Sequence, residues 1–220
     1  MTVRVVTGHD GYQWDRIAAV TLPYVERYCG RHGYELWDVP LATYADGRPA
    51  SWGKVAALAR ALHGADAAVW IDADVLVRPD AAAIHEVVPG TAWQALVFHN
   101  VPEGEIANCG VWLVRPEMAG VLRTVWDDVV FIDHPWWEQA AVLRLLGYGV
   151  DTWPITPPVG EPTNLFARTF ELDGWWNAHP HDTRRGAMAY ARMRHATPGN
   201  NRDRLAMLRA WVREWEAVTA

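Results

Sequence analysis

The chain has 220 residues, of which 50% are apolar, and its formal net charge at pH 7 is -6. This length allows one sizeable α/β domain with its own core, and we expect no second full domain. This negative net charge argues against the strongly basic surface that binds a nucleic-acid backbone or an anionic membrane, so we expect no nucleic acid as a partner.

The sequence carries no pattern typical of secretion or membrane insertion. Its first residues resemble a strand rather than a signal peptide, and its apolar stretches are much shorter than the about 20 residues of a membrane span. Cys29 and Cys109 are the only cysteines, which leaves a single disulfide open but excludes a disulfide framework. We therefore expect a soluble protein of the reducing cytoplasm.

Expected strands and helices alternate in the first part of the chain. A β-rich run at residues 3–7 ends at Gly8, and a helix over about 14–31 is closed by Gly33. The next elements are expected to be a strand at 35–39, a polar loop at 40–50, a helix at 52–63 that Ser51 could cap, and a buried strand at 67–71. This order is typical of a parallel sheet covered by helices.

The regular alternation of strands and helices ends further along the chain, where we expect strands of mixed direction. The predicted elements are strands at 93–98 and 110–114, helices at about 116–127 and 137–146, and a late strand at 150–153. Residues 154–199 are rich in Pro, Gly, Asn, His and Trp and are expected to form loops. The final segment places Leu205, Leu208, Val212 and Trp215 near helical spacing, which predicts a docked helix.

Two aspartates, Asp72 and Asp74, directly follow the buried strand at 67–71. Both carboxylates can project at the carboxyl edge of the sheet, where open α/β sheets bind ligands. Two ionised carboxylates about 4 Å apart repel each other by roughly 4 kcal/mol at an effective dielectric constant of 20, and a divalent cation reverses this penalty. Such pairs are also common in solvated loops and helix caps, but the preceding strand fixes the direction of this one. Oxygen ligands favour Mg²⁺ or Mn²⁺.

Five short segments occur in an order that resembles a known enzyme family. They are Trp52-Gly-Lys54, VWIDADVLV at 69–77, NCGVWLVR at 108–115, Trp137-Glu-Gln139 and His195. Each motif is short, and only their joint order, from Val3 to about Arg202, is specific. This order resembles the galactosyl-, xylosyl- and mannosyltransferase family of GT-A glycosyltransferases from the eukaryotic Golgi.

The resemblance implies an α/β chain with the GT-A fold, which has a Rossmann-like mixed central sheet flanked by helices. One domain would cover residues 1–220, with a nucleotide-binding half at 1–80, a sugar and acceptor half at 90–203 and a C-terminal helix at 204–220. The implied activity is the transfer of a hexose or pentose from a nucleotide-sugar, expected to be a UDP-sugar, with Mn²⁺ or Mg²⁺ and with retention of configuration. The acceptor stays open among a glycan, a protein and a small molecule.

The resemblance also assigns roles to individual residues. The metal ligands would be Asp72, Asp74 and His195, because a neutral imidazole can complete the shell. Glu138 and Gln139 would face the bond being exchanged, with Glu138 as general base in an inverting enzyme and either residue as a shield of the cationic sugar in a retaining one. Residues expected near the donor are Val6, Thr7, Gly8, Lys54, Asp72, Asn108, Gly199 and Arg202.

Some of these residues have simpler interpretations. Lys54 fits equally well as a surface charge on a helix, and Arg202 as an exposed arginine at a helix start, since its spacing from His195 departs by one from the family pattern. His179 and His181 are alternative metal ligands. Gly110 could let the ligand approach the backbone closely.

The acceptor side is the least specified. Most of the 14 tryptophans should lie in the core, but the pairs at 136–137 and 175–176 could line an acceptor cleft, because indoles suit sugar rings. Candidate hydroxyl-binding groups in that region are Asp151, Asn164, Asp173 and Asn177.

Two other functions fit the acidic pair. In phosphatases of the haloacid-dehalogenase type, Asp72 would be the nucleophile, with Asp127 and Asp128 as later metal ligands. That motif normally belongs to the first core strand, whereas two expected strands precede it here. A non-catalytic protein that binds sugar nucleotides is the third possibility.

Overall fold

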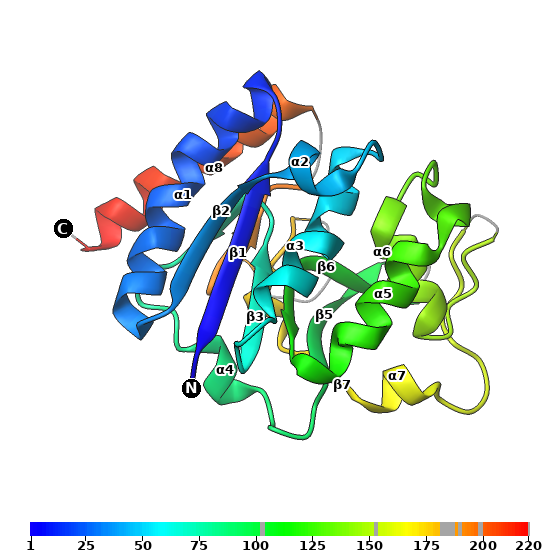
Figure 1. Cartoon of the computed structure of the whole chain (residues 1–220). Coiled ribbons are helices and arrows are strands. Elements are labelled where there is room, and N and C mark those ends of the chain that lie inside the picture. The colour runs from blue at the N-terminus through cyan, green and yellow to red at the C-terminus, as the bar shows by residue number, and fades with distance from the viewer. Residues whose placement is uncertain (102–103, 152–153, 181–187, 189–190, 198–199, 220) are drawn as a thin grey trace.

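Most of the strands join one mixed sheet with helices on both of its faces (Figure 1). The computed structural model describes residues 1–101, 104–151, 154–180, 188, 191–197 and 200–219. Within these residues a six-stranded sheet has the order β2-β1-β3-β6-β5-β7, and β4 and β8 form a separate pair.

The elements have the following bounds. The strands are β1 Val3–His9, β2 Glu35–Pro40, β3 Ala67–Ile71, β4 Val75–Val77, β5 Gln94–Val101, β6 Gly104–Val114, β7 Thr169–Leu172 and β8 Met193–His195. The helices are α1 Tyr12–His32, α2 Leu41–Ala45, α3 Gly53–Ala61, α4 Ile84–Val87, α5 Ala119–Asp127, α6 Trp137–Leu145, α7 Asn164–Ala167 and α8 Asn201–Thr219.

The strand directions divide the sheet into two parts. β1 runs parallel to β2 and to β3, as the alternating strands and helices predict. β6 runs antiparallel to both β3 and β5, and β7 is parallel to β5. The prediction of mixed directions beyond β3 is therefore confirmed.

Side chains alternate between the two faces of the sheet and build two core layers. Val6 and Trp70 pack with α3, α5 and α6 on one face, whereas Val5 and Ile71 pack with α1 and α4 on the other. The C-terminal helix α8 lies along α1, where Leu208 is buried in a third cluster, as the helical spacing predicts (Figure 1). The face that carries Trp70 also carries the site described below.

Several predicted elements differ from the structure in the first half of the chain. The expected loop at 40–50 contains α2, and Ser51 does not cap α3, because it lies in a 3₁₀ turn at Ala50–Trp52 that leads directly into the helix. A further strand, β4, follows Asp74 at once. It was missed because three residues are too short for periodicity to reveal.

The prediction that residues 154–199 form only loops was wrong. This region contributes α7, the edge strand β7 and β8, whose pairing partners lie far away in the sequence. The strand expected at 150–153 does not form within the described residues, where Gly149 makes only an isolated bridge to Thr156, and residues 152–153 lie outside them.

The structure also bears on the expectations about membrane spans and disulfides. Among the described residues, no helix combines the length and the apolar character that crossing a bilayer requires. Cys29 and Cys109 are both buried and unpaired by a disulfide.

Candidate functional site

Three potential metal ligands converge beyond the end of β3. Asp72 follows β3, Asp74 precedes β4, and His195 ends β8. Because β4 and β8 pair antiparallel with Val75 opposite His195, the imidazole lies beside Asp74, and the backbone N–H of Ala196 donates to the carbonyl of Asp74 at 3.0 Å.

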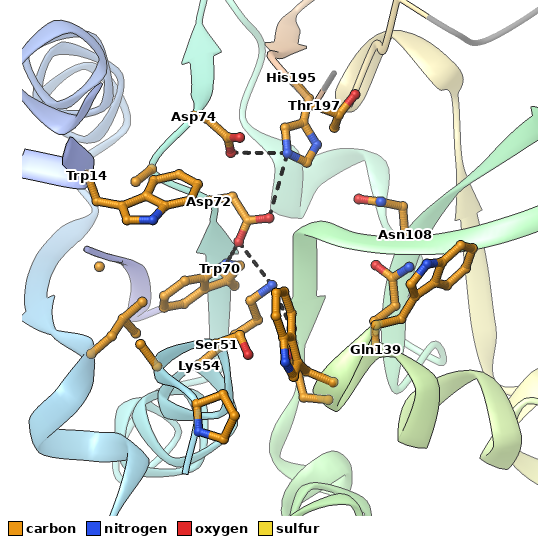
Figure 2. Close-up of a pocket in the computed structure, with 18 of the residues that line it drawn as sticks. Trp14, Ser51, Lys54, Trp70, Asp72, Asp74, Asn108, Gln139, His195 and Thr197 are labelled. Atoms are coloured by element: carbon orange, nitrogen blue, oxygen red, sulfur yellow. Dashed lines mark hydrogen bonds and ion pairs between the residues drawn. The ribbon is translucent and has the colours of Figure 1, made fainter. Parts of the chain in front are cut away.

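The ligand atoms of this cluster point toward one another (Figure 2). Nε2 of His195 lies 3.1 Å from Oδ1 of Asp74 and 3.8 Å from Oδ2 of Asp72, and one ligand atom from each residue lies within 4.8 Å of the others. Asp74 and His195 are buried, and Asp72 is half-buried. The three residues that the sequence assigns to one metal site therefore lie together, and their role as metal ligands stays a prediction.

A chain of hydrogen bonds determines which nitrogen of His195 faces the aspartates. The backbone N–H of Gly110 donates to Oδ1 of Asn108 at 2.8 Å, so this atom is the amide oxygen. The amide nitrogen of Asn177 donates to the same oxygen at 2.8 Å, which leaves the Asn177 oxygen to accept from Nδ1 of His195 at 3.0 Å. Nδ1 therefore carries a hydrogen, and whenever the ring is neutral it is Nε2 that directs a lone pair at the carboxylates.

The role expected for Asn177 changes accordingly. It is fully buried, so it holds His195 instead of contacting a sugar from the solvent side. Sequence reasoning missed this role, because Asn177 and Asn108 lie 69 residues apart and only the fold brings them together.

Arg204 and, when its ring is protonated, His195 place positive charge beside the buried carboxylate of Asp74. Burial alone raises the pKa of this carboxyl group, but His195 and Arg204 outweigh it and lower the pKa of Asp74 below its ordinary value. Nε of Arg204 lies 3.7 Å from Oδ2 of Asp74, and its guanidinium carbon lies over Trp14, 5.3 Å from the ring centroid. Asp74 is therefore an anion that is ready to bind a cation.

Lys54 is buried between two carboxylates, so its interpretation as a surface charge is wrong. Nζ lies 2.9 Å from Oδ1 of Asp72 and 3.1 Å from Oε1 of Glu138, and it also donates to the carbonyl of Cys109 at 3.3 Å. Burial alone lowers the pKa of this ammonium, but the two carboxylates raise the pKa of Lys54 above its ordinary value. It is the single lysine of the chain and a permanent cation of the site.

Glu138 and Gln139 differ in what they leave available to a ligand. Oε1 of Gln139 accepts from the backbone N–H of Cys109 at 3.1 Å, so only its amide nitrogen is free to bind elsewhere. Oε2 of Glu138 is buried and has no hydrogen-bond partner among the described residues. Burial, together with Asp72, raises the pKa of Glu138 above its ordinary value despite the adjacent Lys54.

These groups line one cavity of about 760 Å³. Its walls come from the end of β1, the turn after β3, the β5–β6 hairpin, the start of α6 and the N-terminal turn of α8. The charged and polar residues that line it include Asp72, Asp74, Lys54, Glu138, His195 and Arg204.

The residues predicted to lie near a donor differ in whether they line the cavity. Gly8, Lys54, Asp72 and Asn108 line the cavity. Val6 and Thr7 are buried and lie outside its lining, and Arg202 is exposed, whereas Arg204, two residues further along, lines it. Arg204 was missed because the expected spacing from His195 favoured Arg202. Gly199 and His181 lie outside the described residues.

Other candidate residues lie apart from the acidic pair. His179 lines the cavity, but its ring centroid is 6.2 Å from that of His195 and it is not in the ligand cluster. The phosphatase interpretation requires Asp127 and Asp128 near Asp72, yet neither lines the cavity. Asp127 is exposed at the end of α5, and Asp128 pairs with Arg144.

Solved structures of other proteins share the fold of this chain. The sequence gives no match to a protein-family model and none to a curated protein. A glycosyltransferase involved in the glycosylation of the major capsid of PBCV-1 aligns over 96% of this chain and 100% of its own, with 19% identity and a TM-score of 0.68. The glycosyltransferase GlyE of Streptococcus pneumoniae, in its apo form, aligns over 97% of this chain and 64% of its own, with 12% identity and a TM-score of 0.62.

A third solved structure contains ligands. The galactosyltransferase LgtC, in complex with donor and acceptor sugar analogues, aligns over 93% of this chain and 94% of its own, with 13% identity and a TM-score of 0.52. At these identities the likeness concerns the fold. The chain has the GT-A glycosyltransferase fold, as the resemblance implied.

Proposed function

We propose that this protein is a metal-dependent glycosyltransferase that moves a hexose or pentose from a nucleotide-sugar to an acceptor hydroxyl. The observation that carries the proposal is the cluster of Asp72, Asp74 and His195 inside a cavity of about 760 Å³. This volume suits a small-molecule ligand such as a nucleotide-sugar. The glycosyltransferases that share the fold support the reaction class. The order of the motifs supports the galactosyl-, xylosyl- and mannosyltransferase family and a UDP-sugar donor.

The ligand atoms fit a divalent cation. Two carboxylates and Nε2 of His195 face one another, and with a neutral imidazole all three groups direct lone pairs into the space between them, where a cation can bind. Carboxylate oxygens with one imidazole suit Mn²⁺, and Mg²⁺ where water completes the shell. Such an ion, when bound, takes up the negative charge that develops on the diphosphate as the sugar leaves.

Arg204 supports a diphosphate at the same place. Its side chain lines the cavity beside Asp74, and its Nε has no hydrogen-bond partner among the described residues, whereas its terminal nitrogens donate to Asn201 and Thr197. A guanidinium carries a permanent positive charge that attracts phosphate oxygens. We therefore assign to Arg204 the diphosphate contact that the motif spacing had suggested for Arg202.

Glu138 is a better candidate than Gln139 for the group next to the anomeric carbon. Its Oε2 has no hydrogen-bond partner among the described residues, whereas the oxygen of Gln139 already accepts from Cys109. Lys54 holds Oε1 of Glu138 and so orients the carboxyl group. Glu138 would shield the cationic sugar, and Gln139 would donate from its amide to a sugar hydroxyl.

The proposed reaction exchanges one bond at the anomeric carbon. The bond from this carbon to the β-phosphate oxygen breaks, and its electron pair stays on the departing nucleoside diphosphate. The acceptor oxygen forms the new bond from the same face, which retains configuration, and its proton passes to the departing phosphate oxygen. The retaining outcome is carried over from the resembling family.

The structure also bears on the alternative functions and on the cellular compartment. Asp127 and Asp128 do not line the cavity, which speaks against the phosphatase. The Oε2 atom of Glu138, which has no partner in the described part of the chain, favours an enzyme over a protein that only binds sugar nucleotides. The two free cysteines fit a reducing compartment such as the cytoplasm.

The test measures two reactions of a panel of nucleotide-sugars, with and without Mn²⁺: hydrolysis of the donor and transfer of its sugar to an acceptor. Both are monitored by release of the nucleoside diphosphate. We expect turnover with Mn²⁺ and a UDP-sugar, and its loss in Asp74→Asn. Asp127→Asn is the matched control, because this aspartate is exposed and lies outside the cavity. Metal-independent turnover, or release of phosphate from an aryl phosphate by the wild-type protein, would reject the proposal.

A further inference from the structure

The part of the cavity between the β5–β6 hairpin and the start of α6 is aromatic. It is lined by His99, Ile106, Pro135, Trp136, Trp137 and His179. His99 and Ile106 lie opposite each other in the hairpin, and the ring of His179 lies 4.5 Å from that of His99. None of these six residues carries a carboxylate or a permanent cation, and Glu138, which follows Trp137, is buried beside Lys54. This part therefore favours an uncharged ligand.

Trp137 has an unusual backbone and an unusual exposure. It is the first residue of α6 and adopts a φ of 43°, which bulky residues rarely adopt and glycine adopts without cost. Its backbone N–H donates to the carbonyl of His134 at 2.9 Å, so the turn before the helix holds this conformation. The side chain is still 44% exposed, and burial therefore does little to offset the backbone strain. A strained, exposed indole beside Glu138 points to a ligand.

We propose that Trp137 is the stacking platform for the sugar ring of an uncharged glycoside acceptor, an inference that rests on the proposed function. One face of a pyranose presents C–H groups that pack on an indole, and its rim presents hydroxyls. The amide nitrogens of Asn108 and Gln139 lie in the same cavity to bind such hydroxyls, because the oxygens of both side chains are already used by backbone N–H groups.

The experiment measures transfer to neutral disaccharides, to their para-nitrophenyl glycosides and to a serine- and threonine-containing peptide. Trp137→Gly removes the indole and relieves the positive φ, so we expect the KM for the glycoside to rise at least tenfold more than the KM for the donor, with no loss of thermal stability. Trp137→Phe keeps an aromatic face and should stay within threefold of the wild type. Trp37→Ala, on the edge strand β2 outside the cavity, should change neither constant.

A binding measurement separates this inference from the proposed function. Saturation-transfer NMR with the same glycosides needs no donor, no metal and no turnover, and it should detect the ring C–H protons with the wild-type protein but not with Trp137→Gly. Donor hydrolysis without glycoside binding would overturn the inference and leave the proposed function standing. Preferred transfer to the peptide, or an unchanged glycoside KM in Trp137→Gly, would overturn it as well.

Discussion

The imidazole of His195 packs directly on the backbone of Gly110. A Cβ atom at Gly110 would lie 2.5 Å from Cε1 and 2.7 Å from Nδ1 of His195, closer than van der Waals contact allows. The glycine in β6 is therefore needed because the ring of His195, the proposed metal ligand, crosses the strand there. Sequence analysis had interpreted Gly110 as room for a bound sugar, and the close approach is correct but the neighbour is a side chain of the protein.

Gly110→Ala tests this packing. We expect the methyl group to displace the His195 ring and to weaken Mn²⁺ binding by about tenfold or more, as loss of orientation around a ligand does. Titration of Mn²⁺ followed by electron paramagnetic resonance measures the change directly. Gly120→Ala in α5 is the matched control, because no atom lies within 4 Å of its added Cβ, and it should keep wild-type affinity. Equal affinity in both variants would contradict the assignment.

Asn177→Ala tests the hydrogen bonds that orient His195. Without the amide oxygen, Nδ1 has no acceptor, the other tautomer becomes accessible, and Mn²⁺ affinity should fall by about 10- to 100-fold. Isothermal titration calorimetry gives the affinity, and the ¹⁵N chemical shifts of the ring report the tautomer. Asn164→Ala, an exposed asparagine at the start of α7, serves as the control. An unchanged tautomer in Asn177→Ala would exclude the orienting role.

Lys54 offers a direct measurement of charge, because it is the only lysine of the chain. Protein labelled with ¹³C-lysine should give a single Cε signal. Since Asp72 and Glu138 raise its pKa, this signal should not titrate up to pH 10.5, the ordinary value of a lysine. Glu138→Gln removes one carboxylate and should move the titration to lower pH. A Lys54 signal that titrates below its ordinary value would mean that burial outweighs the ion pairs.

Glu138 should make stability depend on pH. Its pKa in the folded protein is raised above the ordinary value of 4.5, so the folded state binds this proton more tightly than the unfolded chain does. Its contribution to stability is thus largest at low pH and is lost as the pH rises through the folded-state pKa. The free energy of unfolding of Glu138→Gln, measured with urea and a chelator at about pH 5 and about pH 8, should improve relative to wild type at the higher pH. A pH-independent difference would argue against the raised pKa.

Local patterns in the sequence were sufficient to predict much of the fold. The strand that ends at Asp72, the helix closed by Gly33 and the final helix all follow from apolar periodicity and from one glycine with a φ of 67°. The short strands β4 and β8 could not be predicted in this way. Each has three residues, so its existence depends on the other rather than on its own pattern.

The sequence by itself determined that two carboxylates stand at the end of a buried strand, because a strand and the residues after it are specified by neighbours in the chain. Only the tertiary structure decided which groups surround them. Pairing of β8 with β4 brought His195 to Asp74, the docking of α8 on α1 brought Arg204 in place of Arg202, and burial turned Lys54 into a fixed counter-ion. These choices depend on contacts between distant segments, whose geometry is set by how whole elements pack and leaves no local pattern to detect.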